Sequence, residues 1–125
     1  NRYNFEKIIL KKIIEKKIDI IILAGFMRIL SKRFVRIFKG KIVNIHPSLL
    51  PKFKGLNTFQ RVLNSKEKYT GCTVHYVDEK LDNGRIILKR KISISNKDNI
   101  TTLKKKVQFE EYKAYSNAIR KIFQI

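Results

Sequence analysis

Two polar residues at the end of an apolar segment have side chains and a spacing that would suit a catalytic site. Asn44 and His46 flank Ile45, follow two apolar residues, and are themselves followed by prolines. Side chains two residues apart in a strand project to the same side, so Asn44 and His46 are predicted to lie together. An Asn side-chain N–H can stabilise an oxyanion, and a His can act as a general acid or base. Ligands of open α/β sheets bind at the carboxyl ends of strands, where this pair is expected.

A carboxylate further along the chain could complete the set. Asp82 opens the turn sequence Asp-Asn-Gly, and a carboxylate near His46 would favour the protonated imidazole. The three residues suit attack of an amine on a carbonyl-like carbon without a covalent enzyme intermediate. From the residues alone, a purely structural role for all three stays open. A Ser48–His46–Asp82 triad is a weaker alternative, because Ser48 does not sit on a strand-to-helix elbow.

The apolar pattern predicts the elements that must position these residues. A single α/β domain over residues 1–125 is expected. The short apolar run 18–23 predicts a parallel strand covered on both faces, and the strands 70–77 and 85–94 are expected to pair as an antiparallel unit. Ser31 and Thr58 are predicted helix N-caps. The full set of predicted elements is helices over 1–17, 32–38, 58–65 and 101–123, and strands over 18–23, 42–45, 70–77 and 85–94.

Composition bounds the possible partners. The chain has 29 Lys+Arg against 10 Asp+Glu, a net charge of +19, which would suit an RNA-binding module. However, Lys, Ile and Asn together make up 50 of the 125 residues and Ala only three, which indicates AT-rich coding, and the lysines are scattered. We therefore expect no nucleic-acid partner and keep RNA binding as an alternative.

No run is long enough to span a membrane. With two His and one Cys, no metal site is expected, and Cys72 suits a reducing cytoplasm.

Two motifs at their mutual spacing add a family resemblance. The segments 44–51 (Asn-Ile-His-Pro-Ser-Leu-Leu-Pro) and 71–87 (beginning Gly-Cys-Thr-Val-His-Tyr-Val) resemble the folate-dependent formyltransferase family, and the resemblance covers nearly the whole chain. It is greatest to the members that act on glycinamide ribonucleotide in purine biosynthesis. The resemblance implies a Rossmann-like formyltransferase fold, with a mostly parallel sheet and an antiparallel edge. It also implies formyl transfer from the co-substrate 10-formyltetrahydrofolate to the substrate amine, by a cytoplasmic monomer or homodimer.

The resemblance also assigns roles to individual residues. Asn44 and His46 would steady the oxygen of the tetrahedral intermediate. Asp82 would set the ionisation of His46 and assist proton movement through an ordered water. His75 would support the site. The residues implied to bind folate are Phe26, Arg28, Ile29, Leu30, Ile42 and Val77. Those implied to bind the ribonucleotide are Met27, Gln108 and Glu111.

Related activities and departures from the family pattern leave alternatives. Formyltetrahydrofolate deformylases usually have a second His where this chain has Pro47, and methionyl-tRNA formyltransferases usually lack a His at position 75. Asn57 and Phe59 stand where the family more often has histidines. The family begins with a strand and a Gly-rich phosphate-binding loop, which this sequence does not contain. We therefore expect the C-terminal portion of a formyltransferase domain, lacking the N-terminal βα units. An inactive truncated remnant is the rival interpretation.

Overall fold

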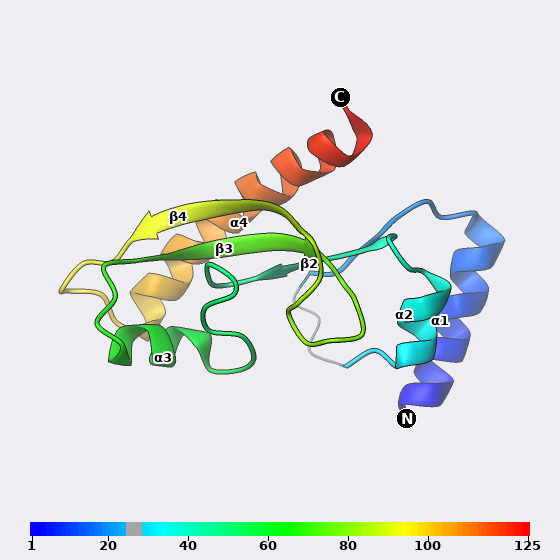
Figure 1. Cartoon of the computed structure of the whole chain (residues 1–125), viewed down its shortest axis with the longest axis horizontal. Coiled ribbons are helices and arrows are strands. Elements are labelled where there is room, and N and C mark those ends of the chain that lie inside the picture. The colour runs from blue at the N-terminus through cyan, green and yellow to red at the C-terminus, as the bar shows by residue number, and fades with distance from the viewer. Residues whose placement is uncertain (25–28) are drawn as a thin grey trace.

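The computed structural model describes residues 1–24 and 29–125 as helices and strands that follow one another along the chain (Figure 1). Its elements fall close to the predicted ranges. In chain order they are α1 (Arg2–Lys16), β1 (Ile21–Ile22), α2 (Lys32–Ile37), β2 (Ile42–His46), α3 (Thr58–Asn64), β3 (Tyr69–Tyr76), β4 (Ile86–Ser93) and α4 (Ile100–Phe123).

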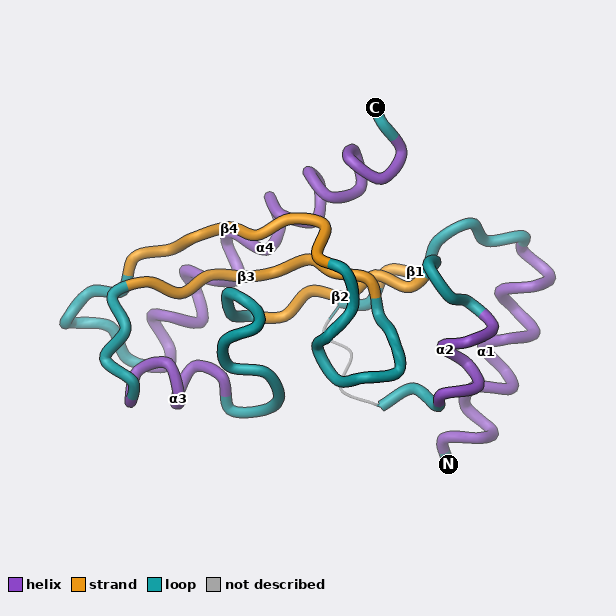
Figure 2. Tube along the Cα trace, in the orientation of Figure 1, coloured by secondary structure: helices purple, strands orange, loops and turns teal. Residues whose placement is uncertain are grey.

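The strands form one mixed sheet in the order β1-β2-β3-β4 (Figure 2). β1 and β2 are parallel, with Ile21 opposite Ile42. β2 and β3 are antiparallel, with Asn44 opposite His75, and β4 pairs antiparallel with β3. The α/β class and the antiparallel edge are confirmed. Among the described strands, parallel pairing is limited to β1 and β2.

One face of the sheet carries the main apolar core. The long helix α4 packs on this face against β3 and β4, and lies behind them in the view of Figure 1. Along β3 the core side chains recur at every second residue, as a strand with one apolar face requires. The core residues of the sheet and of α4 include Val43, Cys72, Val74, Leu103, Val107, Ala114 and Ala118.

A second apolar cluster lies at the other end of the molecule, where α1 and α2 run side by side (Figure 1). Phe34 and Val35 of α2, and Phe38 at its C-cap, pack with Ile42, which is fully buried. From α1, the partly buried Ile9 and Ile13 pack against the edge of this cluster. The cluster therefore attaches both N-terminal helices to the start of β2.

Two local expectations differ from the structure. The run 18–23 is a strand only at Ile21–Ile22, and Ile22 is 38% exposed, so β1 is not covered on both faces. The reason is its place at the edge of the sheet, with pairing on one side only. Asn57, not Thr58, is the N-cap of α3, while the Thr58 hydroxyl donates to the Gly55 carbonyl instead.

The predicted cap of α2 is confirmed, since Ser31 Oγ accepts a hydrogen bond from the Phe34 amide at 3.1 Å. None of the described helices is both long and apolar enough to cross a membrane.

The core position of Leu103 gives a test of this architecture. Replacing Leu103, which is fully buried, with Ala should lower the free energy of unfolding by about 2–5 kcal/mol, because the change leaves a cavity between α4 and the sheet. The matched control is Leu56→Ala, since Leu56 is 74% exposed and should change little. Denaturant unfolding of the protein that contains this chain measures both. Equal effects of the two substitutions would contradict the packing described here.

Candidate active site

The face of the sheet opposite α4 is polar where β2 and β3 meet. Asn44 pairs with His75, and His46 pairs with Thr73. Because directly opposed residues of an antiparallel pair lie on the same face, these four side chains share one surface. The prediction that Asn44 and His46 lie on one side is thus confirmed. The sequence pattern of two polar residues two apart also occurs in β3, and could have identified Thr73.

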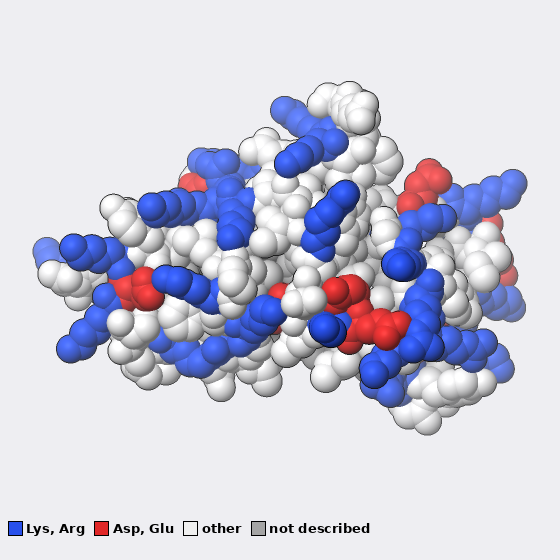
Figure 3. All heavy atoms as spheres, viewed as in Figure 1, with Lys and Arg blue, Asp and Glu red and all other residues white. Residues whose placement is uncertain are grey.

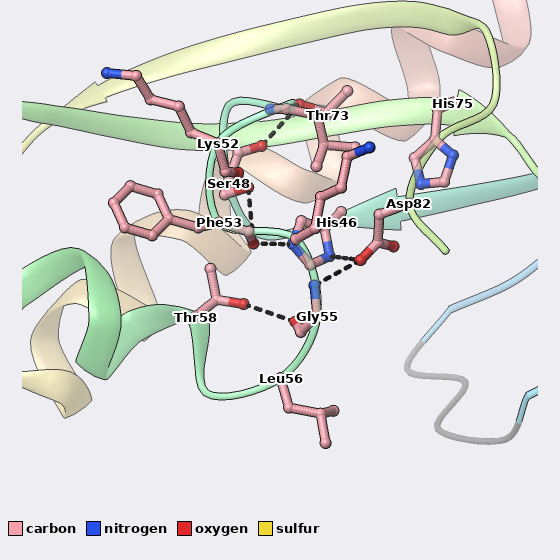
Figure 4. A network of polar contacts seen from close by, with 12 residues as sticks. His46, Ser48, Lys52, Phe53, Gly55, Leu56, Thr58, Thr73, His75 and Asp82 are labelled. Atoms are coloured by element: carbon pink, nitrogen blue, oxygen red, sulfur yellow. Dashed lines mark hydrogen bonds and ion pairs between the residues drawn. The ribbon is translucent and has the colours of Figure 1, made fainter. Parts of the chain in front are cut away.

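His46 is buried and contacted at both ring nitrogens (Figure 4). Nδ1 lies 3.5 Å from the Asp82 carboxylate, and Nε2 lies 2.7 Å from the Phe53 carbonyl oxygen. Both neighbours accept hydrogen bonds, and an imidazole carries a hydrogen on both nitrogens only when it is protonated. Each ring nitrogen of His46 therefore faces a hydrogen-bond acceptor.

The Asp82 side chain is held in place by the backbone of two loops. Its Oδ2 atom accepts a hydrogen bond from the Gly55 amide at 2.8 Å, and the side chain is only 8% exposed. Asp82 itself has φ +47°, a left-handed conformation that Asp tolerates better than most residues. Gly84 lies so close to β3 that a Cβ atom would approach the Tyr76 carbonyl oxygen to 1.6 Å. The Asp-Asn-Gly turn thus brings Asp82 to His46, and Gly84 permits the close approach.

The Ser48 hydroxyl has a structural task. It donates to the Lys52 carbonyl, and the Ser48 carbonyl in turn accepts from Thr73 Oγ1 at 2.7 Å. Thr73 Oγ1 also accepts from the Leu50 amide at 3.0 Å. These contacts fold the segment after β2 back over the polar face (Figure 4). They do not support the Ser-His-Asp triad, because the Ser48 hydroxyl donates to backbone and not to His46.

Asn44 and His75 both have polar atoms available near this pair. Among the described residues, none hydrogen-bonds the half-buried Asn44 side chain. His75 Nδ1 lies 2.9 Å from the Tyr76 carbonyl, and His75 Nε2 is buried with no partner in the described part of the chain. Burial lowers the pKa of His75 most, and the nearby Asp82 charge acts against this shift. His75 is therefore suited to remain a neutral imidazole beside His46 and Asp82.

The two predicted ribonucleotide contacts on α4 differ in environment. Gln108 is exposed and Glu111 is half-buried. Burial raises the pKa of Glu111, and no described cation pairs with its carboxylate. One turn further along, the Tyr115 hydroxyl donates to the Leu23 carbonyl at the end of β1. The helix surface bearing Glu111 is thus attached to the carboxyl end of the parallel strand pair.

The predicted folate residues divide into three groups. Phe26 and Arg28, with the predicted ribonucleotide contact Met27, lie outside the described residues. Ile29 is 73% exposed. The remaining three come together in the cluster beside α2: Leu30, Ile42 and Val77.

The fold and the polar face together indicate the class of protein. The family model described as formyl transferase matches residues 1–119, and the chain belongs to this family. Its structure also resembles solved phosphoribosylglycinamide formyltransferases. For the one from Brucella melitensis the TM-score is 0.91 at 43% identity, covering 98% of this chain and 62% of that one. For the one from Anaplasma phagocytophilum it is 0.92 at 38% identity, covering 94% and 58%. The predicted Rossmann-like formyltransferase fold is confirmed.

Curated relatives agree with the structural neighbours. The phosphoribosylglycinamide formyltransferase of Haemophilus influenzae is 45% identical over 103 residues, which are 82% of this chain and 49% of that protein. The trifunctional purine biosynthetic protein adenosine-3 of Bos taurus is 46% identical over 120 residues, 96% of this chain and 12% of that protein. The chain thus spans about half the length of the first relative and a small part of the second.

Two neighbouring carboxylates on α4 give a pH test of this site. The raised pKa of Glu111 means that the folded state holds its proton more tightly than the unfolded chain, so this group makes stability fall as pH rises above about 4. Glu111→Gln should therefore be more stable than the wild type at pH 7, with the gain vanishing at low pH. The measurement is thermal unfolding of both proteins between pH 3 and 8.

Glu110 is the matched control, because Arg90 donates a hydrogen bond to it at 2.6 Å and lowers its pKa. This group contributes stability at neutral pH that is lost as pH falls. Glu110→Gln should thus be less stable than the wild type at pH 7, and the difference should shrink in acid. Shifts in the same direction for Glu110→Gln and Glu111→Gln would contradict the environments described here.

Proposed function

We propose that this chain supplies the reaction centre and folate side of an enzyme that transfers a formyl group from 10-formyltetrahydrofolate to the amine of glycinamide ribonucleotide. The observation that carries the proposal is the buried His46–Asp82 pair, 3.5 Å apart, with Asn44 on the same strand, whose side-chain amide has no hydrogen-bond partner among the described residues. The names of the relatives support the reaction and its place in purine biosynthesis.

The chemistry follows from the groups on the polar face. The substrate amine attacks the formyl carbon, and the electron pair of the carbonyl moves to oxygen. The side-chain N–H groups of Asn44 and protonated His46 donate to this oxyanion, which stabilises the tetrahedral intermediate. The amine then loses a proton, and the folate nitrogen gains one as its bond to the formyl carbon breaks. Asp82 keeps His46 positively charged and, through a water molecule, assists this proton movement.

One contact of His46 must change during the reaction. Its Nε2 atom donates to the Phe53 carbonyl, and its Nδ1 atom faces Asp82. The formyl oxygen can take the Nε2 hydrogen bond by replacing the Phe53 carbonyl oxygen, which is also a hydrogen-bond acceptor. The Nδ1 contact to Asp82 is retained in this exchange. The segment that contains Phe53 would then move away from His46 as the folate binds.

The remaining predicted residues complete the proposed binding sites. His75 lies opposite Asn44 on β3 and supports the Asn44 side of the centre. Glu111 can accept hydrogen bonds from the ribose hydroxyls, since an ionised carboxylate is an acceptor only. Binding would supply hydrogen-bond partners that the described part of the chain does not provide. The folate would contact Phe26, Arg28, Ile29, Leu30, Ile42 and Val77. The ribonucleotide would contact Met27, Gln108 and Glu111.

Other functions have less support. On the face drawn in Figure 3, Lys and Arg side chains are spread over the surface and do not form one patch, which disfavours an RNA-binding module. The deformylase and methionyl-tRNA alternatives would act on the same cofactor, and comparing the three acceptors, water, methionyl-tRNA and glycinamide ribonucleotide, distinguishes them. A cytoplasmic location and a monomer or homodimer remain part of the proposal.

Substitutions in the centre test the proposed roles. In the complete protein, His46→Ala and Asp82→Ala should each lower kcat by about 10²–10⁴-fold, and Asn44→Ala by about 10²–10³-fold, because each removes a charge or donor used in the transition state. The measurement is steady-state formation of formylglycinamide ribonucleotide.

Lys80→Ala is the control, because Lys80 is exposed in the same loop as Asp82 and only its backbone amide makes a described contact. Its kcat should match the wild type. Near-normal turnover of His46→Ala or Asp82→Ala would refute the assigned roles.

A further inference from the structure

Two long-range hydrogen-bond contacts hold the chain on either side of residues 24–30. The Tyr115 hydroxyl donates to the carbonyl of Leu23, 92 positions earlier. The Glu6 carboxylate accepts from the amide of Ser31 at 2.6 Å and also from the Ser31 hydroxyl, 25 positions later. We propose that Tyr115 and Glu6 are positioning residues, Tyr115 for the ribonucleotide and Glu6 for the folate. This inference rests on the proposed function.

Tyr115 connects the proposed nucleotide contacts to the reaction centre. It lies four residues after Glu111, and residues at this spacing share a face of a helix. The Leu23 carbonyl takes the Tyr115 hydrogen bond, and the Leu23 amide donates to the Val43 carbonyl at 2.8 Å. Val43 directly precedes Asn44. A continuous path of backbone and hydrogen bonds therefore runs from the Glu111 turn of α4 to the residue that faces the formyl oxygen.

The phenol of Tyr115 is suited to a permanent contact. Burial raises its pKa, and the charge of Glu111 raises it further, so the hydroxyl stays a donor over the physiological range. The bond fixes how far the helix that holds the ribose stands from the strand that holds the formyl group. A helix displaced from this position would hold the Glu111 carboxylate at the wrong distance from the ribose hydroxyls, so the ribonucleotide would bind more weakly.

Glu6 has the corresponding role at the other end. It is only 9% exposed, and no described Lys or Arg forms an ion pair with it. Burying a carboxylate is costly unless hydrogen bonds satisfy it, and both of its oxygens are satisfied by Ser31. The Ser31 hydroxyl in turn accepts from the Phe34 amide, at the first turn of α2. Glu6 thereby fixes the start of α2.

The start of α2 borders the proposed folate pocket. Phe34 is buried in the cluster that also contains Leu30, Ile42 and Val77. A shift of Ser31 would move Phe34 and Leu30 together, and with them the apolar surface offered to the pterin. The Glu6 contact joins α1 to the start of α2, whereas Gln108 and Glu111 lie on α4, so its loss should affect one substrate more than the other.

The test uses single-atom or near-isosteric changes in the complete protein. Tyr115→Phe removes only the hydroxyl and should raise the KM for glycinamide ribonucleotide about five- to tenfold, with the KM for folate within about twofold. Glu6→Gln keeps the size of the side chain and removes one acceptor. It should raise the KM for folate about five- to tenfold, with the KM for glycinamide ribonucleotide within about twofold. The readout is the KM of each substrate measured at saturation of the other, together with the dissociation constant of each.

The controls are close neighbours on the same helices. Tyr112→Phe changes a tyrosine of α4 that is 75% exposed, and Glu15→Gln changes an exposed carboxylate of α1, so both should leave the constants unchanged. If Tyr115 and Glu6 had a purely structural role, their substitution would lower thermal stability without changing the KM of one substrate more than that of the other.

Suppose that the wild-type protein transfers formyl, but that Tyr115→Phe and Glu6→Gln leave both KM values unchanged or change them equally. That result would overturn this inference and leave the proposed function intact. If the wild-type protein forms no formylglycinamide ribonucleotide, the proposed function fails and this inference fails with it.

Discussion

The buried pair of His46 and Asp82 is the constraint around which the polar half of the molecule is arranged. Polar and ionisable side chains inside a protein are tolerated only when hydrogen bonds replace their contacts with water. Here the Gly55 amide donates to the carboxylate and the Phe53 carbonyl accepts from the imidazole. The loop after β2 and the loop before β4 therefore have to meet above the sheet. Gly84, which has no room for a side chain, permits the second loop to approach.

The sheet separates this chemistry from the core. Alternate residues of β2 and β3 face either α4 or the two loops, so Val43 and Val74 stabilise the fold while Asn44 and His75 face the site. The division lets polar groups be placed on the second face without disturbing the packing of α4. At the start of β2 the residue on this second face is the apolar Ile42, and there the apolar cluster beside α2 begins.

Several polar groups of the proposed reaction centre and binding sites have no partner among the described residues. They are the Asn44 amide, His75 Nε2 and the Glu111 carboxylate, whose pKa is raised by burial. Such groups lower the stability of the free protein, since each is partly removed from water without compensation. A bound substrate that supplies a carbonyl oxygen and hydroxyl groups would provide what is missing. In the proposed function, the stability that these groups cost the free protein is recovered when the substrates bind.

The sequence by itself determined the order and the kind of the elements, because helical and strand periodicities are local. The motif around Asn44, His46 and Asp82 also indicated the reaction centre that we propose. Only the tertiary structure decided what these side chains contact. The Phe53 carbonyl and the Gly55 amide are backbone groups. Nearly every residue has the same backbone groups, so the sequence does not indicate which of them contact His46 and Asp82. The bonds of Glu6 to Ser31 and of Tyr115 to Leu23 join positions that become neighbours only when α1 and α4 pack. The limited extent of β1 likewise depends on which strands pair beside it.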